Sequence, residues 1–395
     1  FSAMKAILFA LLLLCISQGR HQTRGIQMPN EYIVKDLIHE SVGIETLETP
    51  HFNIYFNHNP TTRWDHPIMY FKSHILVVQK TILDNVPGIL EKFFWGFSKF
   101  MEFRTQGMNG KLSLIDENFL EHKGISEILG IPTHHVMLTN FAYELFAYCT
   151  SIVAHDKNGE IIHARNMDYP LYQSMQNLTY TADFFDNGEF LFRSTMFAGY
   201  TGVFTAMKPG KFAISINERH TKTAMGIGVN ILRFITGSYS PASLLKYTCR
   251  YAQSYNEAKE ILSKYPLTAP VYLIVSGTEV DQGAIISRDR SGAADIWLIN
   301  NHSTADWVIV QTNYDHWIKP SPASDKERAN TAYHHLKNIG RSELDKENIV
   351  TDVLQIPQIL NRGTIYSTVM QAKITGGHST DVDVGGAYFK NYRYQ

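Results

Sequence analysis

The chain has 395 residues, of which 44% are hydrophobic and 12% aromatic, so it can bury a large core in one big domain or two. Its 36 basic and 37 acidic residues leave a net charge of −1 at pH 7, which gives no electrostatic case for binding nucleic acid. The 17 histidines would make the protein strongly cationic below roughly pH 6. Such a charge swing would suit an acidic compartment with anionic lipid surfaces.

The N-terminus has the pattern of a secretory signal peptide. From Met4, one lysine precedes an apolar run at 6–16, and small residues follow. Residues 1–19 are therefore interpreted as leader residues and a signal peptide, and no later apolar stretch is long enough to cross a bilayer. Two glycosylation sequons, at Asn177 and Asn301, fit the same route. We expect a lysosomal or secreted protein.

The number of cysteines limits the disulfide bonds that the chain can form. Without the signal peptide only Cys149 and Cys249 remain, so a disulfide framework does not hold this chain together. Cys249 lies in a predicted helix that begins at Ser240-Pro241, where we interpret it as core filling. A Cys149–Cys249 bridge is the alternative, and it would consume the thiol of Cys149.

Residues 20–148 are predicted to be mostly helical. A strand is expected at 52–56, and helices at 68–83, 86–103 and 138–146. The segment 86–103 is unusually aromatic and is apolar on more than one face. It is either a buried helix or an element that presents apolar surface to lipid.

A hairpin is predicted around Cys149, which opens an apolar, β-branched run. Asn158-Gly159 is a turn signal, and matching offsets on its two sides place Cys149 opposite a residue between 165 and 168. Arg165 and Asp168 then lie near the thiol. An adjacent arginine lowers a thiol pKa, and a carboxylate can fix the base that takes the proton, so the trio indicates a nucleophile. The alternative is a buried structural cysteine beside a surface ion pair.

Beyond this hairpin the pattern becomes rich in strands. Paired strands are expected at 190–193 and 195–205, another strand at 212–219, helices at 241–253 and 258–264, and hairpins at 271–275 with 284–287 and at 295–299 with 307–312. This order predicts an α+β fold in which helices cover antiparallel sheets.

Several segments carry a family resemblance through their order and spacing. They are Asn140-Phe141-Ala142-Tyr143-Glu144, Cys149-Thr150-Ser151-Ile152-Val153-Ala154, Arg165-Asn166-Met167-Asp168-Tyr169-Pro170, Asn217-Glu218-Arg219, Gln311-Thr312-Asn313-Tyr314-Asp315-His316-Trp317 and Thr364-Ile365-Tyr366-Ser367-Thr368-Val369-Met370. Together they resemble the acid ceramidase and N-acylethanolamine acid amidase family across nearly the whole mature chain.

The resemblance implies an N-terminal-nucleophile hydrolase with an αββα sandwich, made as an inactive precursor. The precursor would cut itself at acid pH between Tyr148 and Cys149, leaving 20–148 as a helical pro-region or α-subunit and 149–395 as the catalytic β-subunit in one α/β heterodimer. The freed α-amine, whose ordinary pKa is near 8, would then serve as general base for the thiol of the same residue.

Further roles follow from the resemblance, residue by residue. It implies that Arg165 holds the thiolate and that Asp168 accepts a hydrogen bond from the freed amine. It also implies that Asn313 donates to the oxyanion and that Glu218 acts in self-cleavage and in the oxyanion region. Arg328 is implied as a further arginine of the site, with Lys326 as the alternative match. For Glu218 and Arg219 the alternative interpretation is a strand-end ion pair.

The resulting hypothesis is an enzyme that hydrolyses lipid N-acyl amides to fatty acid and amine, with a membrane or lipid micelle as its working surface. Acid ceramidase activity is the near alternative, and a non-catalytic lipid-binding protein on the same fold is the alternative from another class. No cofactor is implied. No metal site is expected either, because the chain has no His-Glu-x-x-His motif and adjacent histidines such as His334-His335 diverge on a helix.

Overall fold

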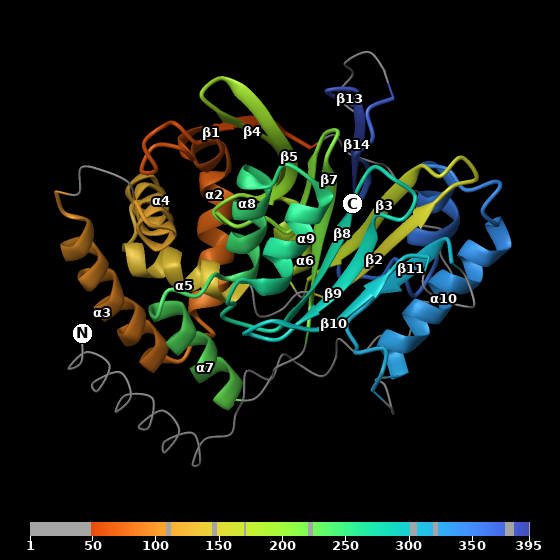
Figure 1. The fold of residues 1–395 in the computed structure, drawn as a ribbon. Coiled ribbons are helices and arrows are strands. Elements are labelled where there is room, and N and C mark those ends of the chain that lie inside the picture. Colours follow the sequence, from red (N-terminus) through yellow and green to blue (C-terminus); the bar gives the residue numbers. More distant parts are fainter. Residues whose placement is uncertain are drawn as a thin grey trace.

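Two β-sheets lie face to face in the middle of the protein, and helices cover both outer faces (Figure 1). The computed structural model describes residues 49–107, 112–143, 148–169, 171–219, 224–300, 306–318, 323–375 and 383–394. The signal-peptide prediction and the Asn301 sequon lie outside these residues. The four layers are the αββα sandwich that the resemblance implies, and the predicted α+β class is confirmed.

The larger sheet has eight strands in the order β1-β4-β5-β6-β7-β8-β9-β10. They are β1 (His51–Tyr55), β4 (Thr179–Asp186), β5 (Glu189–Phe197), β6 (Thr205–Lys208), β7 (Phe212–Glu218), β8 (Val271–Ser276), β9 (Gly283–Arg288) and β10 (Ala293–Leu298). Only β1 pairs in parallel, with β4, and the other neighbours are antiparallel. Through β1 the N-terminal region takes part in the sheet.

The smaller sheet has six strands in the order β11-β2-β3-β12-β14-β13. They are β11 (Val308–Gln311), β2 (Tyr148–His155), β3 (Ile161–Asp168), β12 (Thr364–Gln371), β14 (Ala387–Arg393) and β13 (Asp383–Val384). The central strands β3 and β12 are buried along their whole length, so this sheet is covered on both faces.

The N-terminal helices are α2 (Asp65–Leu83), α3 (Gly88–Thr105), α4 (Leu114–Leu129) and α5 (Thr133–Tyr143). The first two match the predicted helices 68–83 and 86–103, whereas α5 begins before the predicted 138 and α4 was not predicted as a separate helix. In α4 a capping box between Ser113 and Asp116 satisfies the first turn, and Gly130, with φ of 73°, ends the helix in the left-handed region. The later helices are α6 (Tyr172–Gln176), α7 (Ala224–Ile235), α8 (Pro241–Tyr251), α9 (Tyr255–Lys264), α10 (Ala323–Ile339) and the single π-helical turn η2 (Val350–Leu354).

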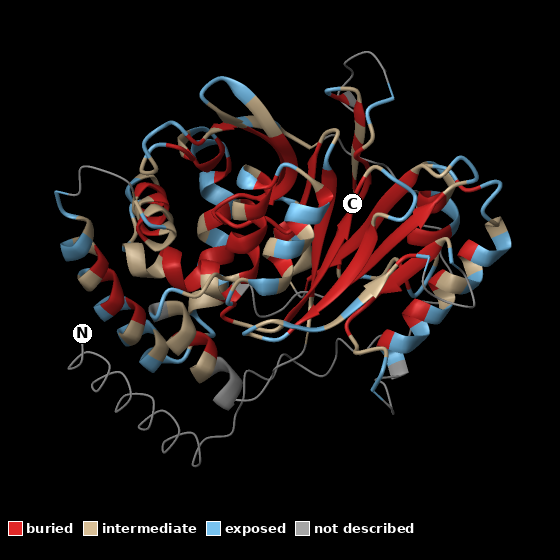
Figure 2. Cartoon of the chain, viewed as in Figure 1, coloured by how far each residue is buried: buried red, intermediate tan, exposed pale blue. Residues whose placement is uncertain are grey.

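Each layer buries its apolar face against the next (Figure 2). One core cluster joins α2, α8 and α9 to the larger sheet, a second joins α10 and η2 to the smaller sheet, and a third, with Val153, Tyr272 and Ile285, lies between the sheets. Cys249 is fully buried in the first cluster, as expected for core filling, and both described cysteines are free. No described helix has the length and apolarity that crossing a bilayer requires.

Two predicted strand pairings are wrong. Residues 190–193 and 195–205 do not form two strands that pair with each other, because 189–197 is the single strand β5, which lies between β4 and β6 in the sheet. Asn187 and Gly188 both have positive φ, 51° and 85°, as a tight two-residue hairpin turn requires. Residues 295–299 and 307–312 do not form a hairpin either, because β10 pairs with β9 while β11 joins β2 in the other sheet.

The aromatic helix α3 has both of the properties expected for segment 86–103. Phe94, Phe97 and Met101 are buried in a cluster with α4 and α5. Trp95 and Phe103, in contrast, are 54% and 79% exposed. The helix is therefore held by one face and presents large apolar side chains to solvent on another.

Two buried histidines remain neutral over much of the acid range. His163 lies between the sheets, where its ring nitrogens are 2.8 Å from Ser215 Oγ and 3.1 Å from Ser276 Oγ. Burial first, and then the charge of Arg165, lowers its pKa to about 3. Burial likewise lowers the pKa of His122, on α4, to about 4.

These histidines make stability depend on pH. Because the folded pKa of His122 lies below the ordinary 6.5, the unfolded chain binds more protons between pH 6.5 and 4, and stability falls as pH falls through that window. The expected loss is about 1.4 kcal/mol per pH unit for each such histidine. His122→Gln should therefore flatten the dependence of the free energy of unfolding on pH between 4 and 6.5, measured by urea unfolding, and His74→Gln, which removes an exposed histidine of α2, is the matched control. An unchanged slope in His122→Gln would contradict the assignment.

Candidate active site

The hairpin β2–β3 places Cys149 at the start of a sheet strand. Asp156 Oδ1 accepts hydrogen bonds from the backbone N–H groups of Asn158 and Glu160, and Gly159 has φ of 79°, so the turn forms where the Asn-Gly signal predicts it. In the resulting register Cys149 lies opposite Met167, within the expected range.

Arg165 holds the thiol from the neighbouring strand. Its Nη2 lies 2.7 Å from Cys149 Sγ and donates to Ile216 O at 3.0 Å. Its Nη1 donates to Phe204 O and to Thr205 Oγ1, both at 2.8 Å. The guanidinium comes from the smaller sheet and its backbone acceptors from the loop before β6 and from β7, so both sheets fix it. Arg165 is fully buried, and the site lies between the sheets.

The surroundings of the thiol favour its protonated form. Burial and, to a smaller extent, the charge of Asp168 raise the pKa of Cys149 above its ordinary value, and they outweigh Arg165, a hydrogen bond from the Asp168 backbone and the charge of Arg328, which lower it. Attack by sulfur therefore requires a base that removes the proton.

Asn313 clamps the nitrogen of the bond that precedes Cys149. Its Oδ1 accepts the Cys149 backbone N–H at 3.0 Å and a bond from Arg328 Nη2 at 2.8 Å. Its Nδ2 donates to Glu218 O at 2.9 Å. Two donors on one side and a carbonyl on the other fix the orientation of this amide. Asn313 reaches this position because β11, which ends two residues earlier, pairs with β2.

Asp168 is buried beside the same backbone. Its carboxylate accepts from Thr364 Oγ1 and from Asn361 Nδ2, both at 2.7 Å, and Arg328 Nη1 is 3.5 Å away. Burial raises the pKa of Asp168, and Arg328 and the two hydrogen bonds oppose that shift without cancelling it. In register Asp168 faces Tyr148, so it lies one residue from the cysteine nitrogen along the ladder.

Arg328, and not Lys326, reaches the site. Arg328 Nη1 donates to Cys149 O at 3.2 Å and to Thr150 Oγ1 at 3.1 Å, and Asp325 Oδ1 accepts from Nη2 at 2.6 Å. Lys326 is exposed on the same helix, α10. The structure therefore brings Cys149, Arg165, Asp168, Asn313 and Arg328 together.

Glu218 belongs to the site through its backbone, because its carbonyl accepts the Asn313 amide. Arg219 pairs in a bidentate manner with Asp315, at 2.7 and 2.8 Å, and also with Asp289 at 2.7 Å. These contacts tie the end of β7 to the segment that carries Asn313, so Arg219 supports the geometry of the site.

Several supporting residues have no role in the sequence-based prediction. Thr205, Met167 and Tyr366 surround Arg165 and the thiol, and Asn361, Thr364 and Asp325 hold Asp168 and Arg328. Thr364 and Tyr366 lie in a segment that carries the family resemblance. Met167 lies in another such segment. Thr205, Asn361 and Asp325 gave no local signal, because they reach the site only in the folded chain.

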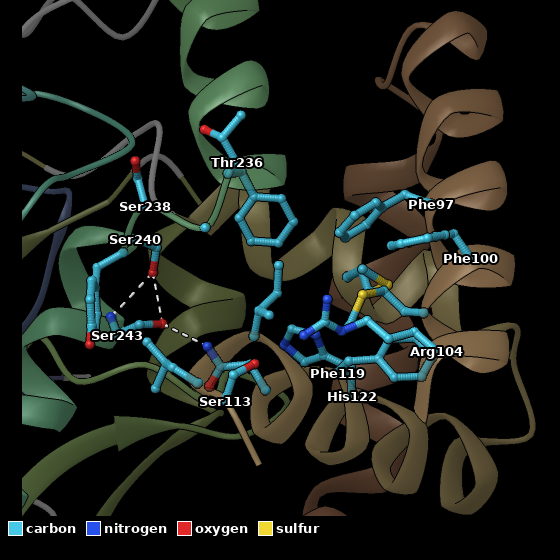
Figure 3. Close-up of a pocket in the computed structure, with 18 residues that line it drawn as sticks. Phe97, Phe100, Arg104, Ser113, Phe119, His122, Thr236, Ser238, Ser240 and Ser243 are labelled. Atoms are coloured by element: carbon cyan, nitrogen blue, oxygen red, sulfur yellow. Dashed lines mark hydrogen bonds between the residues drawn. The ribbon is translucent and has the colours of Figure 1, made fainter. Parts of the chain in front are cut away.

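A separate cavity of about 380 Å³ lies between the helical region and the segment that joins α7 to α8 (Figure 3). Phe97 and Phe100 of α3 form one side, and Ser238, Ser240 and Ser243 form the opposite side. None of the residues that line it belongs to the site around Cys149. The cavity is instead part of the contact between residues before and after the Tyr148–Cys149 bond.

Fold and site together define a class of enzyme. An αββα sandwich that presents a cysteine thiol at the start of a central strand, with a guanidinium on the sulfur and a side-chain amide on the cysteine nitrogen, has the architecture of an amide hydrolase with an N-terminal nucleophile. Residues 149–340 match the model of the linear amide C–N hydrolases, choloylglycine hydrolase family. That match begins at Cys149.

Whole-chain relatives narrow the class. N-acylethanolamine-hydrolyzing acid amidase of Mus musculus is 36% identical over 332 residues, which cover 82% of this chain and 86% of the mouse protein. Acid ceramidase of Homo sapiens is 32% identical over 338 residues, which cover 81% and 83%. A solved Caenorhabditis elegans ortholog of the amidase is 32% identical, with a TM-score of 0.51, and covers 57% of this chain and 93% of its own. The chain belongs to the family of linear amide hydrolases that contains these acid amidases and acid ceramidases.

The two cations at the start of α10 allow a direct comparison. Arg328→Gln should slow activity by about 10- to 100-fold, because it removes hydrogen bonds to Cys149 O and Asn313 Oδ1 that orient the backbone at Cys149. Lys326→Gln removes one exposed charge from the same helix and should leave activity near wild type. Rates of chain cleavage and amide hydrolysis are the measurements. Equal losses in the two variants would assign the effect to α10 as a whole.

Proposed function

We propose that this protein is an acid amidase that hydrolyses lipid N-acyl amides, with N-acylethanolamines as its substrates, to fatty acid and amine. The observation that carries the proposal is the contact of 2.7 Å between Arg165 Nη2 and Cys149 Sγ, at the residue where the match to the hydrolase family begins. The identity with N-acylethanolamine-hydrolyzing acid amidases over most of the chain supports the substrate class.

The proposed first reaction is self-cleavage. Cys149 Sγ attacks the carbonyl carbon of Tyr148, the C–N bond breaks, and the nitrogen leaves as the amine of Cys149 while the acyl group becomes a thioester. Water then hydrolyses the thioester, which restores the thiol and leaves Tyr148 with a carboxylate. Asn313 supports this step because its Oδ1 fixes the nitrogen that must leave.

The mature cycle repeats the chemistry on a lipid amide. The new α-amine, with an ordinary pKa near 8, takes the thiol proton, sulfur attacks the amide carbonyl, and the proton passes to the departing amine. Water releases the fatty acid from the thioester. Arg165 stabilises the thiolate, Asp168 holds the α-amine, and Asn313 with the Glu218 region receives the oxyanion.

After cleavage, residues 20–148 and 149–395 would form one α/β heterodimer without a disulfide. A buried ion cluster supports this association: Glu121 of α4 is bound by Arg63 at 2.6 Å and by Lys246 of α8 at 2.7 Å. Burial raises the pKa of Glu121, but Lys246 and Arg63 outweigh burial and lower it, so the carboxylate stays ionised in acid. The cluster therefore persists where cleavage occurs.

Removing Lys246 is expected to weaken the association of the two chains. Lys246→Met leaves Glu121 buried with one partner fewer, and breaking a buried pair costs about 3–5 kcal/mol. Lys264→Met, which breaks an exposed pair with Glu260, should leave the association of the two chains unchanged. Gel filtration of the cleaved proteins measures the outcome. Co-elution of both chains in Lys246→Met at low concentration would count against this cluster as the connection.

We propose that the enzyme acts at the surface of a membrane or lipid micelle. Trp95 and Phe103 of α3 are more than half exposed, and amphipathic elements with exposed aromatic residues bind lipid interfaces. The relatives are named as an acid amidase and an acid ceramidase, and these names support a lysosomal or similarly acidic location for this protein. Asn177 is exposed, with its Oδ1 2.9 Å from Arg393 Nη2, which leaves its nitrogen for a glycan.

The experiment is a rate comparison of the cleaved protein on palmitoylethanolamide and on ceramide at about pH 5. We expect faster hydrolysis of palmitoylethanolamide. Faster hydrolysis of ceramide would instead make the protein an acid ceramidase, the alternative that its identity of 32% to the human enzyme favours. Hydrolysis of neither lipid, with both lipids still bound, would indicate a lipid-binding protein.

A further inference from the structure

Three side chains with metal-binding groups meet where α3 and α5 begin. Glu91 lies in the first turn of α3, and His134 and His135 lie in the first turn of α5. One potential ligand atom of each lies within 4.8 Å of the other two. The ring centroids of the two histidines are 4.4 Å apart, and His135 Nε2 is 3.3 Å from Glu91 Oε1.

Adjacent histidines lie about 100° apart around a helix, so they do not by themselves form a three-ligand group. The three-ligand group forms here because Glu91 approaches the two histidines from a second helix, α3, which packs against α5. The chain offers a natural comparison in His334 and His335 of α10, whose ring centroids are 5.6 Å apart. Among the residues that the structure describes, that second pair has no carboxylate that completes a three-ligand group.

The distance between His135 and Glu91 fits one edge of a tetrahedral site. Zinc binds histidine nitrogen and carboxylate oxygen at about 2.0–2.2 Å, so two ligands of a tetrahedral site are about 3.3–3.5 Å apart. The separation of 3.3 Å between His135 Nε2 and Glu91 Oε1 matches that edge, and it is longer than an ordinary hydrogen bond. Two imidazoles and one carboxylate select zinc and neighbouring transition metals over magnesium and calcium, which prefer oxygen ligands.

The surroundings decide how such an ion would be held. The Glu91 side chain is 52% exposed and that of His135 is 24% exposed, so water can complete the coordination shell. The first turns of two helices carry partial positive charge, which opposes a cation, but solvent screens this field and the carboxylate of Glu91 offsets it. The arrangement is that of an accessible, medium-affinity site.

We propose that Glu91, His134 and His135 form a binding site for one zinc-class divalent ion, which links the start of α3 to the start of α5. Since α3 carries the exposed Trp95 and Phe103, the bound ion would fix the orientation of the helix that presents them. The inference does not depend on the amidase reaction.

The test is calorimetric titration of the full chain, free of affinity tags and stripped with a chelator, with zinc chloride at pH 7.5. We expect one ion per chain with a Kd of about 1–10 µM. His134→Ala with His135→Ala should weaken binding by more than 10-fold, and Glu91→Gln should weaken it by about 10-fold. His334→Ala with His335→Ala removes the same number of histidines and should bind as wild type does.

Cobalt absorption provides a second readout that does not require activity. Cobalt bound by two imidazoles in a tetrahedral site gives intense visible bands, which the His134→Ala, His135→Ala variant should lack and the His334→Ala, His335→Ala variant should keep. Matching circular dichroism spectra exclude misfolding as the cause. Absence of binding in wild type, unchanged binding without His134 and His135, or equal losses in both double variants would overturn the proposal.

Discussion

Cys149→Ala is expected to leave one uncut chain at acid pH and to lower amide hydrolysis by on the order of 10⁴-fold or more. The replacement removes the only group that attacks the Tyr148 carbonyl and, later, the lipid amide. Folding should survive, because loss of one buried sulfur costs about 1 kcal/mol and Arg165 keeps its bonds to Phe204 O, Thr205 Oγ1 and Ile216 O.

Cys249→Ala is the matched control for this variant. Cys249 is also free and fully buried, but it lies on α8 away from the site, so the same replacement should leave cleavage and hydrolysis intact. Intact masses and N-terminal sequences, taken after incubation at about pH 5 and pH 7.5, measure the result. A new N-terminus at position 149 in the Cys149→Ala samples would mean that an outside protease cuts the bond.

The sequence predicted the site best where its signal is local. Asn158-Gly159 fixes a turn, the turn fixes the register of β2 and β3, and the register brings Arg165 onto the Cys149 thiol. The same kind of signal was available at Asn187-Gly188, which turns β4 into β5, but the prediction did not use it.

The sequence pattern did not predict which strands pair when they are far apart in the chain. Residues 295–299 and 307–312 are neighbours in sequence, which favours a hairpin, yet β11 pairs with β2 because it fills the open edge of the smaller sheet. That pairing is also what carries Asn313 to Cys149. No periodicity reports such a contact, so Asn313 entered the prediction only through the family resemblance.

The direction of the Cys149 pKa shift also could not be predicted from the sequence alone. The sequence indicated that an arginine beside the thiol would lower its pKa, and the Arg165 contact has that effect. Burial, however, outweighs it, because the thiol lies in the interior where the thiolate is poorly solvated. Composition does not report the burial of one atom, so the net direction required the fold.

Asn313→Asp is the second large effect that we expect, a loss of about 10²- to 10³-fold in self-cleavage and in amide hydrolysis. The two side chains have the same shape, so Oδ1 can still accept from the Cys149 N–H and from Arg328. The donor Nδ2 is lost, and a carboxylate oxygen then faces Glu218 O and the place where negative charge develops on the oxyanion.

Asn338→Asp makes the same chemical change on the exposed face of α10 and should leave both rates unchanged. The loss in Asn313→Asp should also be smaller at lower pH, because a protonated aspartate regains a donor and loses its charge. Single-turnover cleavage rates between about pH 4 and 6 test both statements. A rate within threefold of wild type across that range would remove Asn313 from the oxyanion site and leave it the role of holding the Cys149 nitrogen.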